Sequence, residues 1–73
     1  MSLDTGQATR ITLNGAPAET PARTLADLVR ALGHGERNVA TALNGAFVPV
    51  QARGQTPLAP GDRVEVVAPR QGG

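Results

Sequence analysis

The sequence contains no cysteine, lysine, tryptophan or tyrosine. Without cysteine, the chain has no disulfide, no thiolate metal site and no thiol nucleophile. Phe47 is the sole aromatic residue, so the chain lacks the stacking platforms on which single-stranded nucleic acids bind. Without lysine, copies of the chain cannot be joined to one another through side-chain isopeptide bonds, although attachment to other proteins stays open.

Long apolar segments and a strong net charge are also missing. No apolar run approaches the roughly 20 residues of a membrane-spanning helix, and the N-terminus lacks the basic-then-apolar pattern of a secretory signal. A formal net charge of +1 gives no reason to expect a nucleic acid as partner. The 73 residues suffice for one small domain. We therefore expect a cytoplasmic protein that binds neither a membrane nor a nucleic acid.

The first part of the chain predicts a β-hairpin. Residues 9–13 alternate polar and apolar side chains, which is typical of a half-buried strand. Asn14-Gly15 follows, and this dipeptide favours the left-handed conformations of a type I′ turn. The return strand over 16–19 contains Pro17, which has no N–H for the ladder, so we expect this strand to be short and at a sheet edge.

A helix is expected over 24–32. Thr24 is suited to cap its first turn, with Asp27 three residues later in a pattern close to a capping box. Gly33 stands where a helix commonly ends in a left-handed residue. The apolar side chains that form one stripe on this helix are Leu25, Leu28, Val29 and Leu32.

The second half of the chain predicts another hairpin and a last strand. Asn44-Gly45 repeats the type I′ turn signal, and Pro60-Gly61-Asp62 predicts a tight turn. The elements expected in this half are a strand over 39–43, a strand over 47–50, a polar loop over 51–56, a short turn at Pro57-Leu58 anchored by Leu58, and a final strand over 63–67.

This order of elements predicts the fold class. Two hairpins, one helix and a last strand give an α+β protein with a mixed sheet of about five strands, because one helix covers only one face of a sheet. Such a sheet around a single helix is the β-grasp, or ubiquitin-like, architecture. We expect a disordered segment over 1–8, the β-grasp domain over 9–68 and a flexible tail over 69–73.

The tail is the leading candidate for function. The sequence stops on Gly72-Gly73, and a terminal glycine carboxylate has no Cβ to obstruct a reacting partner. That carboxylate is ionised at neutral pH and is a competent nucleophile toward the α-phosphate of ATP. We predict Gly73 as the attachment point of an adenylate or thiocarboxylate, with Gly72, Gln71 and Arg70 threading into the active site of a partner. A glycine-rich end without a function is the plainer alternative.

The open face of the sheet is the second candidate. If Val64 and Val66 point toward the helix, Val67 points away from it, and one of the neighbours Phe47 and Val48 also faces outward. Exposed apolar side chains beside a functional tail form a candidate docking surface. We therefore predict Phe47, Val48 and Val67 as docking residues, although single exposed apolar residues are ordinary.

The sequence shows no active site of its own. It contains no Ser/His/Asp set, no metal-ligand spacing and no phosphate-binding glycine loop. The lone His34 lies between two glycines and is interpreted as a loop residue rather than a metal ligand. We therefore expect no catalytic residue, no metal and no bound cofactor.

Several segments together resemble the ThiS-type sulfur carriers of bacterial thiamine biosynthesis. They are Ile11 to Gly15, the helix from Thr24, Leu43-Asn44-Gly45-Ala46-Phe47-Val48-Pro49, Leu58, Pro60 to Val67, and terminal Gly72-Gly73. The likeness covers about residues 9 to 73, with the Pro17-containing strand and the residues before Thr9 as its loose fits.

The resemblance implies a β-grasp carrier that is not itself an enzyme. Gly73 would be adenylated by a ThiF-type enzyme, which uses ATP, and sulfur from a cysteine desulfurase relay would convert it to a thiocarboxylate. That group would donate sulfur to thiazole synthase. Two alternatives stay open: a carrier like the small subunit of molybdopterin synthase, and a non-catalytic β-grasp interaction module.

Overall fold

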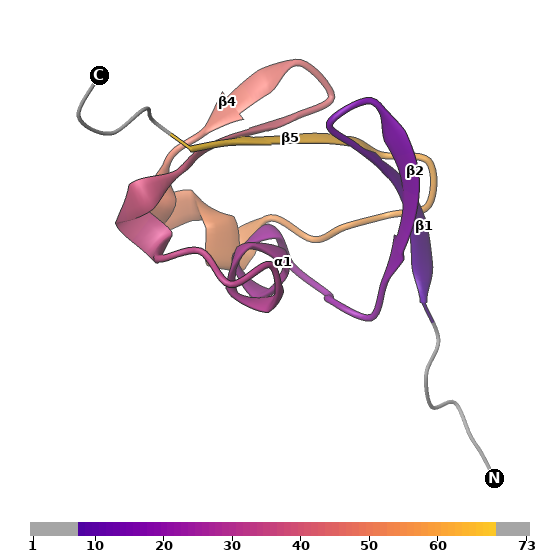
Figure 1. Ribbon diagram of the computed structural model, residues 1–73, viewed down its shortest axis with the longest axis horizontal. Helices are drawn as coiled ribbons and strands as arrows, with labels where there is room; N and C mark the ends of the chain where they lie inside the picture. The colour runs from indigo at the N-terminus through magenta and orange to yellow at the C-terminus, as the bar shows by residue number, and fades with distance from the viewer. Residues whose placement is uncertain (1–7, 69–73) are drawn as a thin grey trace, which may run out of the picture.

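A five-stranded sheet with one α-helix on one side forms the domain (Figure 1). The computed structural model describes residues 8–68, so all but the last residue of the segment expected over 1–8, and the tail expected over 69–73, lie outside the described residues. In chain order the elements are β1 (Thr9–Leu13), β2 (Ala16–Thr20), α1 (Leu25–Ala31), η1 (Glu36–Asn38), β3 (Ala40–Leu43), β4 (Ala46–Val48), η2 (Val50–Gln55) and β5 (Arg63–Val67).

The last strand of the chain lies in the middle of the sheet. The strand order is β2-β1-β5-β3-β4. Both hairpins are antiparallel, β5 runs antiparallel to β3, and β5 runs parallel to β1. Val64 is aligned with Leu13 on one side and with Leu43 on the other. The predicted mixed sheet with a helix across one face is therefore confirmed.

Both hairpins turn at their Asn-Gly pairs. Asn14 and Asn44 have a φ of 52°, and the glycines that follow have φ of 86° at Gly15 and 89° at Gly45. Left-handed backbone at both central positions is what a type I′ turn requires, and it matches the twist of the flanking strands. The two predicted hairpin turns are confirmed.

The helix is close to the prediction at both ends. The Asp27 amide donates to the Thr24 hydroxyl over 3.1 Å, which confirms Thr24 as the cap. Gly33 has a φ of +85° just after the helix. Leu32 was expected in the buried stripe, but its side chain is 40% exposed. It lies at the C-cap, beyond the helical turns that pack against the sheet, so that part of the prediction is wrong.

The core lies between α1 and the inner face of the sheet. Val64 and Val66 of β5 are buried there, as the alternation of that strand predicts. Leu58 packs against this cluster and is partly buried, which confirms it as an anchor. The buried apolar residues are Ile11, Leu25, Leu28, Val29, Val39, Val48, Val64 and Val66.

The segment after β4 differs from the prediction. The strand ends at Val48 rather than Val50, because Pro49 offers no N–H to extend the ladder. The expected polar loop is the 3-10 helix η2, which lies against α1. Beyond it, Pro57 forms a bridge with Thr24 in place of the expected short turn.

Arg53 of η2 is the largest buried polar side chain, with 2% of its surface exposed. Its Nε donates to the Thr41 hydroxyl over 2.9 Å, and its Nη2 donates to the Val39 carbonyl over 2.7 Å. The Thr41 hydroxyl in turn donates to the Val48 carbonyl over 2.8 Å. A buried guanidinium is tolerated only when its donors are hydrogen-bonded. Arg53 therefore joins η2 to β3 and, through Thr41, to β4.

We expect Arg53→Met to destabilise the domain by about 2–4 kcal/mol, because the buried acceptors on Val39 and Thr41 lose charged donors. Urea unfolding followed by far-UV circular dichroism measures the change. Arg37→Met is the matched control, because Arg37 is exposed on η1, and it should change stability by less than about 0.5 kcal/mol. Equal stability of both variants would contradict the role given to Arg53.

Candidate functional site

Four of the predicted site residues lie outside the described residues. They are Arg70, Gln71, Gly72 and Gly73, and the structure describes the chain only as far as Ala68. The structure does describe the residues from which this segment starts, Val67 and Ala68. The segment continues from β5, the central strand, whose last residue is Val67.

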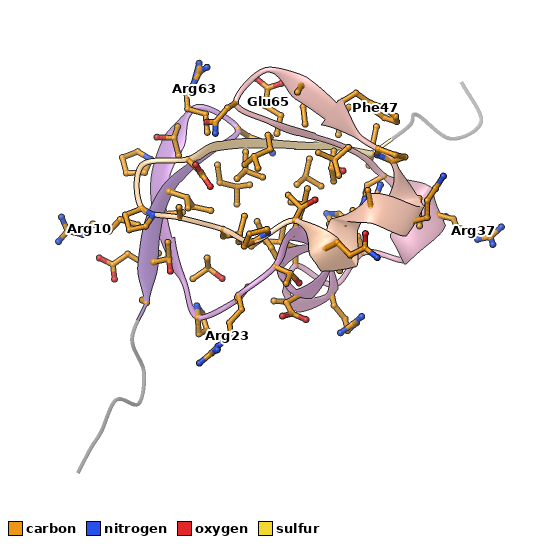
Figure 2. All side chains as sticks on the ribbon, turned by 180° about the vertical axis from the view of Figure 1, so that it is seen from behind. Arg10, Arg23, Arg37, Phe47, Arg63 and Glu65 are labelled. Atoms are coloured by element: carbon orange, nitrogen blue, oxygen red, sulfur yellow. The ribbon has the colours of Figure 1, made fainter. Side chains whose placement is uncertain are left out.

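The side of the sheet that faces away from α1 carries the predicted docking residues. Ala42 is aligned with Glu65 of β5 and with Phe47 of β4, so these three side chains share one face. Figure 2 shows Phe47, Glu65 and Arg63 on the side away from the helix. Phe47 is 69% exposed, a large fraction for the only aromatic ring of the chain.

Val67 lies on the same face. It follows Glu65 by two residues, it is 59% exposed, and it is aligned with Ala40 of β3. We use the name outer patch for Phe47, Ala42, Ala40 and Val67. The outer patch therefore includes the last residue of β5 and lies at the start of the C-terminal segment.

Val48 does not belong to this surface. It is aligned with Thr41 on the inner face, and only 8% of it is exposed, so it forms part of the core. Adjacent residues of a strand point to opposite faces, and Phe47 takes the outer one. The prediction that Val48 contributes to docking is wrong for this reason, whereas Phe47 and Val67 remain available at the surface.

Charged side chains lie on the same face toward the start of β5. Arg63 and Glu65 alternate with the buried Val64 and Val66 and are exposed. On the neighbouring hairpin, Arg10 forms an ion pair with Glu19 over 3.2 Å. The outer face thus changes from charged, beside β1 and β2, to apolar, at the end of β5.

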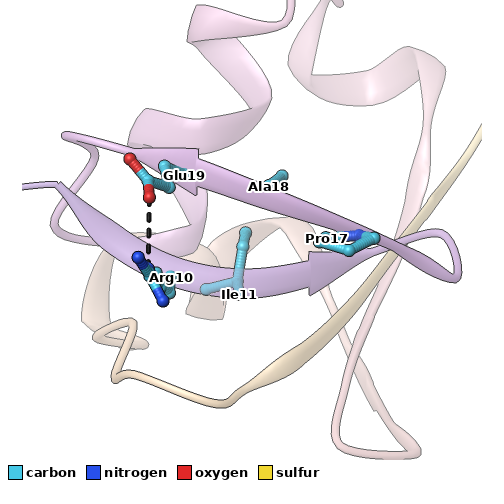
Figure 3. Close-up of a pocket in the computed structure, with 5 residues that line it drawn as sticks. All are labelled: Arg10, Ile11, Pro17, Ala18 and Glu19. Carbon is cyan, nitrogen blue, oxygen red and sulfur yellow. Dashed lines mark hydrogen bonds and ion pairs between the residues drawn. The ribbon is translucent and has the colours of Figure 1, made fainter.

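An open hollow lies over the β1–β2 hairpin (Figure 3). Its polar side chains, Arg10 and Glu19, are paired with each other, and 84% and 58% of their side-chain surfaces are exposed. An ion pair this exposed contributes little free energy. With both charges satisfied and in water, the hollow offers no unpaired group that would orient a ligand.

Within residues 8–68, no three acidic or histidine side chains come together as a possible metal site. No helix in the same range has the length and apolar character needed to cross a bilayer.

Comparison with known proteins identifies the family. A family model described as the ThiS family matches residues 11–73, which is most of the chain. This chain belongs to the ThiS family. The match includes the outer patch and extends over the terminal residues that the structure does not describe.

A solved structure agrees with this assignment. The fold is similar to the crystal structure of a thiamine biosynthesis protein (ThiS) from Geobacter metallireducens, with a TM-score of 0.72 and 29% sequence identity. The similarity covers 89% of this chain and all of that one. The predicted β-grasp architecture is thereby confirmed. No curated protein matches the chain.

The sequence analysis missed the role of three residues in this ThiS-family domain. Asn14 and Asn44 were interpreted only as turn residues, but each side chain also hydrogen-bonds to β5 or to the residue before it. Arg53 was placed in a polar loop. No local pattern distinguishes these three side chains from solvent-exposed ones, because their partners are far away in the sequence.

Phe47 and Val48 point to opposite faces of the sheet, so substitutions at these two positions test which face is exposed. Phe47→Ala should change the free energy of unfolding by less than about 0.5 kcal/mol, because its ring is in water. Val48→Ala should cost about 1–3 kcal/mol, because it removes buried methyl groups and leaves a cavity. Urea titrations of both variants measure the difference, and a larger loss for Phe47→Ala would refute this assignment of faces.

Proposed function

We propose that this chain is a sulfur carrier protein of thiamine biosynthesis. The observation that carries the proposal is the ThiS family match over residues 11–73, which the similarity to the ThiS crystal structure supports. In this function the chain is a protein co-substrate on which other enzymes act. It is not a catalyst.

The reacting group we propose is the α-carboxylate of Gly73. One of its oxygens bonds to the α-phosphorus of ATP in the active site of a ThiF-type enzyme, and pyrophosphate leaves. A sulfur nucleophile at the oxidation level of hydrosulfide then attacks the carbonyl carbon, and AMP leaves. The product is a thiocarboxylate. A cysteine desulfurase relay would supply the sulfur as a persulfide, a thiol would reduce it to the hydrosulfide level with formation of a disulfide, and thiazole synthase would accept the sulfur.

The C-terminal segment is long and narrow enough to enter the active site of a partner. From Val67, the last residue of β5, six further residues lead to Gly73. Fully extended, they span about 20 Å, enough to reach into another protein's active site. The absence of a Cβ at Gly72 and Gly73 keeps the reacting end narrow. ATP is bound by the partner in this scheme, and the carrier itself holds no cofactor.

The outer patch is the proposed docking surface for the adenylating enzyme. A surface continuous with the base of the reacting segment would bring the partner's active site within reach of Gly73. Burial of Phe47 would supply most of the apolar contact, because aromatic side chains dominate the energetics of protein interfaces. The charged half of the same face, with Arg63 and Glu65, would form the polar rim.

Deletion of Gly73 should abolish ATP-dependent adenylation and thiocarboxylate formation, since the carboxylate would then belong to Gly72 and stop one residue short. Intact-mass spectrometry after incubation with a ThiF-type enzyme, ATP and a sulfur source detects the oxygen-to-sulfur replacement. The circular dichroism spectrum and urea midpoint of the deletion variant should equal those of the wild type. Modification of the shortened chain would contradict the proposal.

The same assay separates the alternatives. A thiocarboxylate accepted by thiazole synthase supports the thiamine carrier, whereas one accepted only by the large subunit of molybdopterin synthase indicates the sister pathway. A wild-type terminus that stays unmodified, both with a ThiF-type enzyme and with the adenylating enzyme of the molybdopterin pathway, would indicate a passive interaction module.

Phe47→Ala should weaken binding to the adenylating enzyme by about 2 kcal/mol or more, roughly thirtyfold in Kd, if the ring is an interface anchor. Isothermal titration calorimetry measures the affinity. Leu32→Ala is the control, because Leu32 is an exposed apolar residue at the end of α1 rather than on the sheet face. Equal affinities for Phe47→Ala and wild type would remove the outer patch from the interface.

A further inference from the structure

The side chain of Asn14 continues the sheet beyond the end of a strand. Strand β1 ends at Leu13, which is aligned with Val64 of β5. The amide of Asn14 donates to the Val64 carbonyl over 2.9 Å, and the chain then turns away. Without the Asn14 side chain, the next backbone groups of β5 on this side, those of Val66, would have no strand opposite them.

The carboxamide of Asn14 takes the place of that missing strand residue. Its Oδ1 accepts from the Val66 amide over 2.9 Å, and its Nδ2 donates to the Val66 carbonyl over 3.2 Å. Both contacts are partly buried and join residues 52 positions apart. One donor and one acceptor on the same side chain thus reproduce the paired backbone contacts of a ladder.

Asn44 makes a related contact at the opposite end of β5. Its Oδ1 accepts from the Arg63 amide over 2.8 Å, its own amide donates to the Arg63 carbonyl over 2.7 Å, and its Nδ2 donates to Asp62 over 3.0 Å. Each asparagine opens a type I′ turn with the same φ. The two therefore hold the start and the end of one strand by the same kind of interaction.

We infer that Asn14 is a positioning residue for the reacting C-terminus, an inference that rests on the proposed function. With Asn14 in place, Val66 lies between two neighbours: its amide and carbonyl are hydrogen-bonded to the carboxamide on one side, and it is aligned with Thr41 of β3 on the other. Val67, the last residue of β5, is aligned with Ala40 alone. Val66 is thus the last residue of β5 with a neighbour on both sides, on the strand that leads to Gly73.

Loss of the Asn14 contacts leaves Val66, like Val67, with a neighbour on the β3 side alone. The segment with a neighbour on one side only then begins at Val66 instead of Val67, and each added residue that the partner must order on binding costs conformational entropy. Pre-organisation of that segment lowers the cost of docking. The cost therefore affects the KM for the carrier, whereas the chemistry at Gly73 and hence kcat stay the same.

Asn14→Gly tests the role, because glycine accepts the left-handed backbone and only the carboxamide is lost. Adenylation by a ThiF-type enzyme, measured at varied carrier concentration, should show a KM raised about tenfold, the equivalent of ~1.4 kcal/mol, with kcat unchanged. Asn44→Gly is the matched control. It loses similar hydrogen bonds at the start of β5 and should keep the wild-type KM.

Amide hydrogen exchange by NMR gives a readout that does not depend on adenylation. In Asn14→Gly the Val66 amide should exchange at least about tenfold faster than the change in global stability explains, whereas in Asn44→Gly it should not. Should Asn14→Gly fail to fold, Asn14→Asp retains an oxygen for the Val66 amide but sets a carboxylate oxygen against the Val66 carbonyl in place of the donor, so its KM should also rise above that of the wild type, and an unchanged KM would overturn the role.

The outcomes separate the two ideas. An unchanged KM for the Asn14 variant beside an active wild type overturns the role of Asn14 alone, as does an equal rise in KM for both glycine variants. A wild-type chain that no ThiF-type enzyme adenylates overturns the proposed function, and this inference with it.

Discussion

The structure depends on the placement of β5 between two hairpins that come earlier in the chain. The two hairpins are not paired with each other in the sheet, because β5 lies between β1 and β3. The buried side chains of Val64 and Val66 place β5 against the core. A central strand exchanges hydrogen bonds on both edges, so its position joins the two halves of the sheet into one layer. This central strand, β5, is also the one that leads to the C-terminus.

Polar side chains complete the sheet where backbone pairing stops. Asn14 supplies Val66 with a donor and an acceptor beyond the end of β1, and Arg53 links η2 to the hydroxyl of Thr41 beneath the second hairpin. Buried backbone groups without partners cost free energy, so these contacts are required where the short strands end. None of these contacts involves Phe47, whose side chain is exposed on the outer face.

The sequence predicted the regular elements well and their mutual contacts poorly. Alternation located the strands, and the Asn-Gly pairs located both hairpin turns, because these signals arise within a few residues of one another. The extension of β4 to Val50 was wrong because Pro49 ends the ladder. The 3-10 helix around Arg53 was missed because that side chain is stabilised by partners on β3, which no local pattern indicates. Of the three residues predicted for docking, Phe47 and Val67 lie at the surface as expected, whereas Val48 lies in the core.

By itself the sequence determined the hairpins, the capped helix, the alternation of β5 and the motifs by which the chain resembles the ThiS family. Each of these follows from short-range rules of backbone conformation and polarity. Only the tertiary structure decided that β5 lies between β1 and β3, which face of the sheet receives Phe47, and which amides hold the strand that leads to Gly73. Strand order and side-chain partnership depend on packing between residues as much as 52 positions apart, and the free energy of such contacts exists only once the whole core has formed.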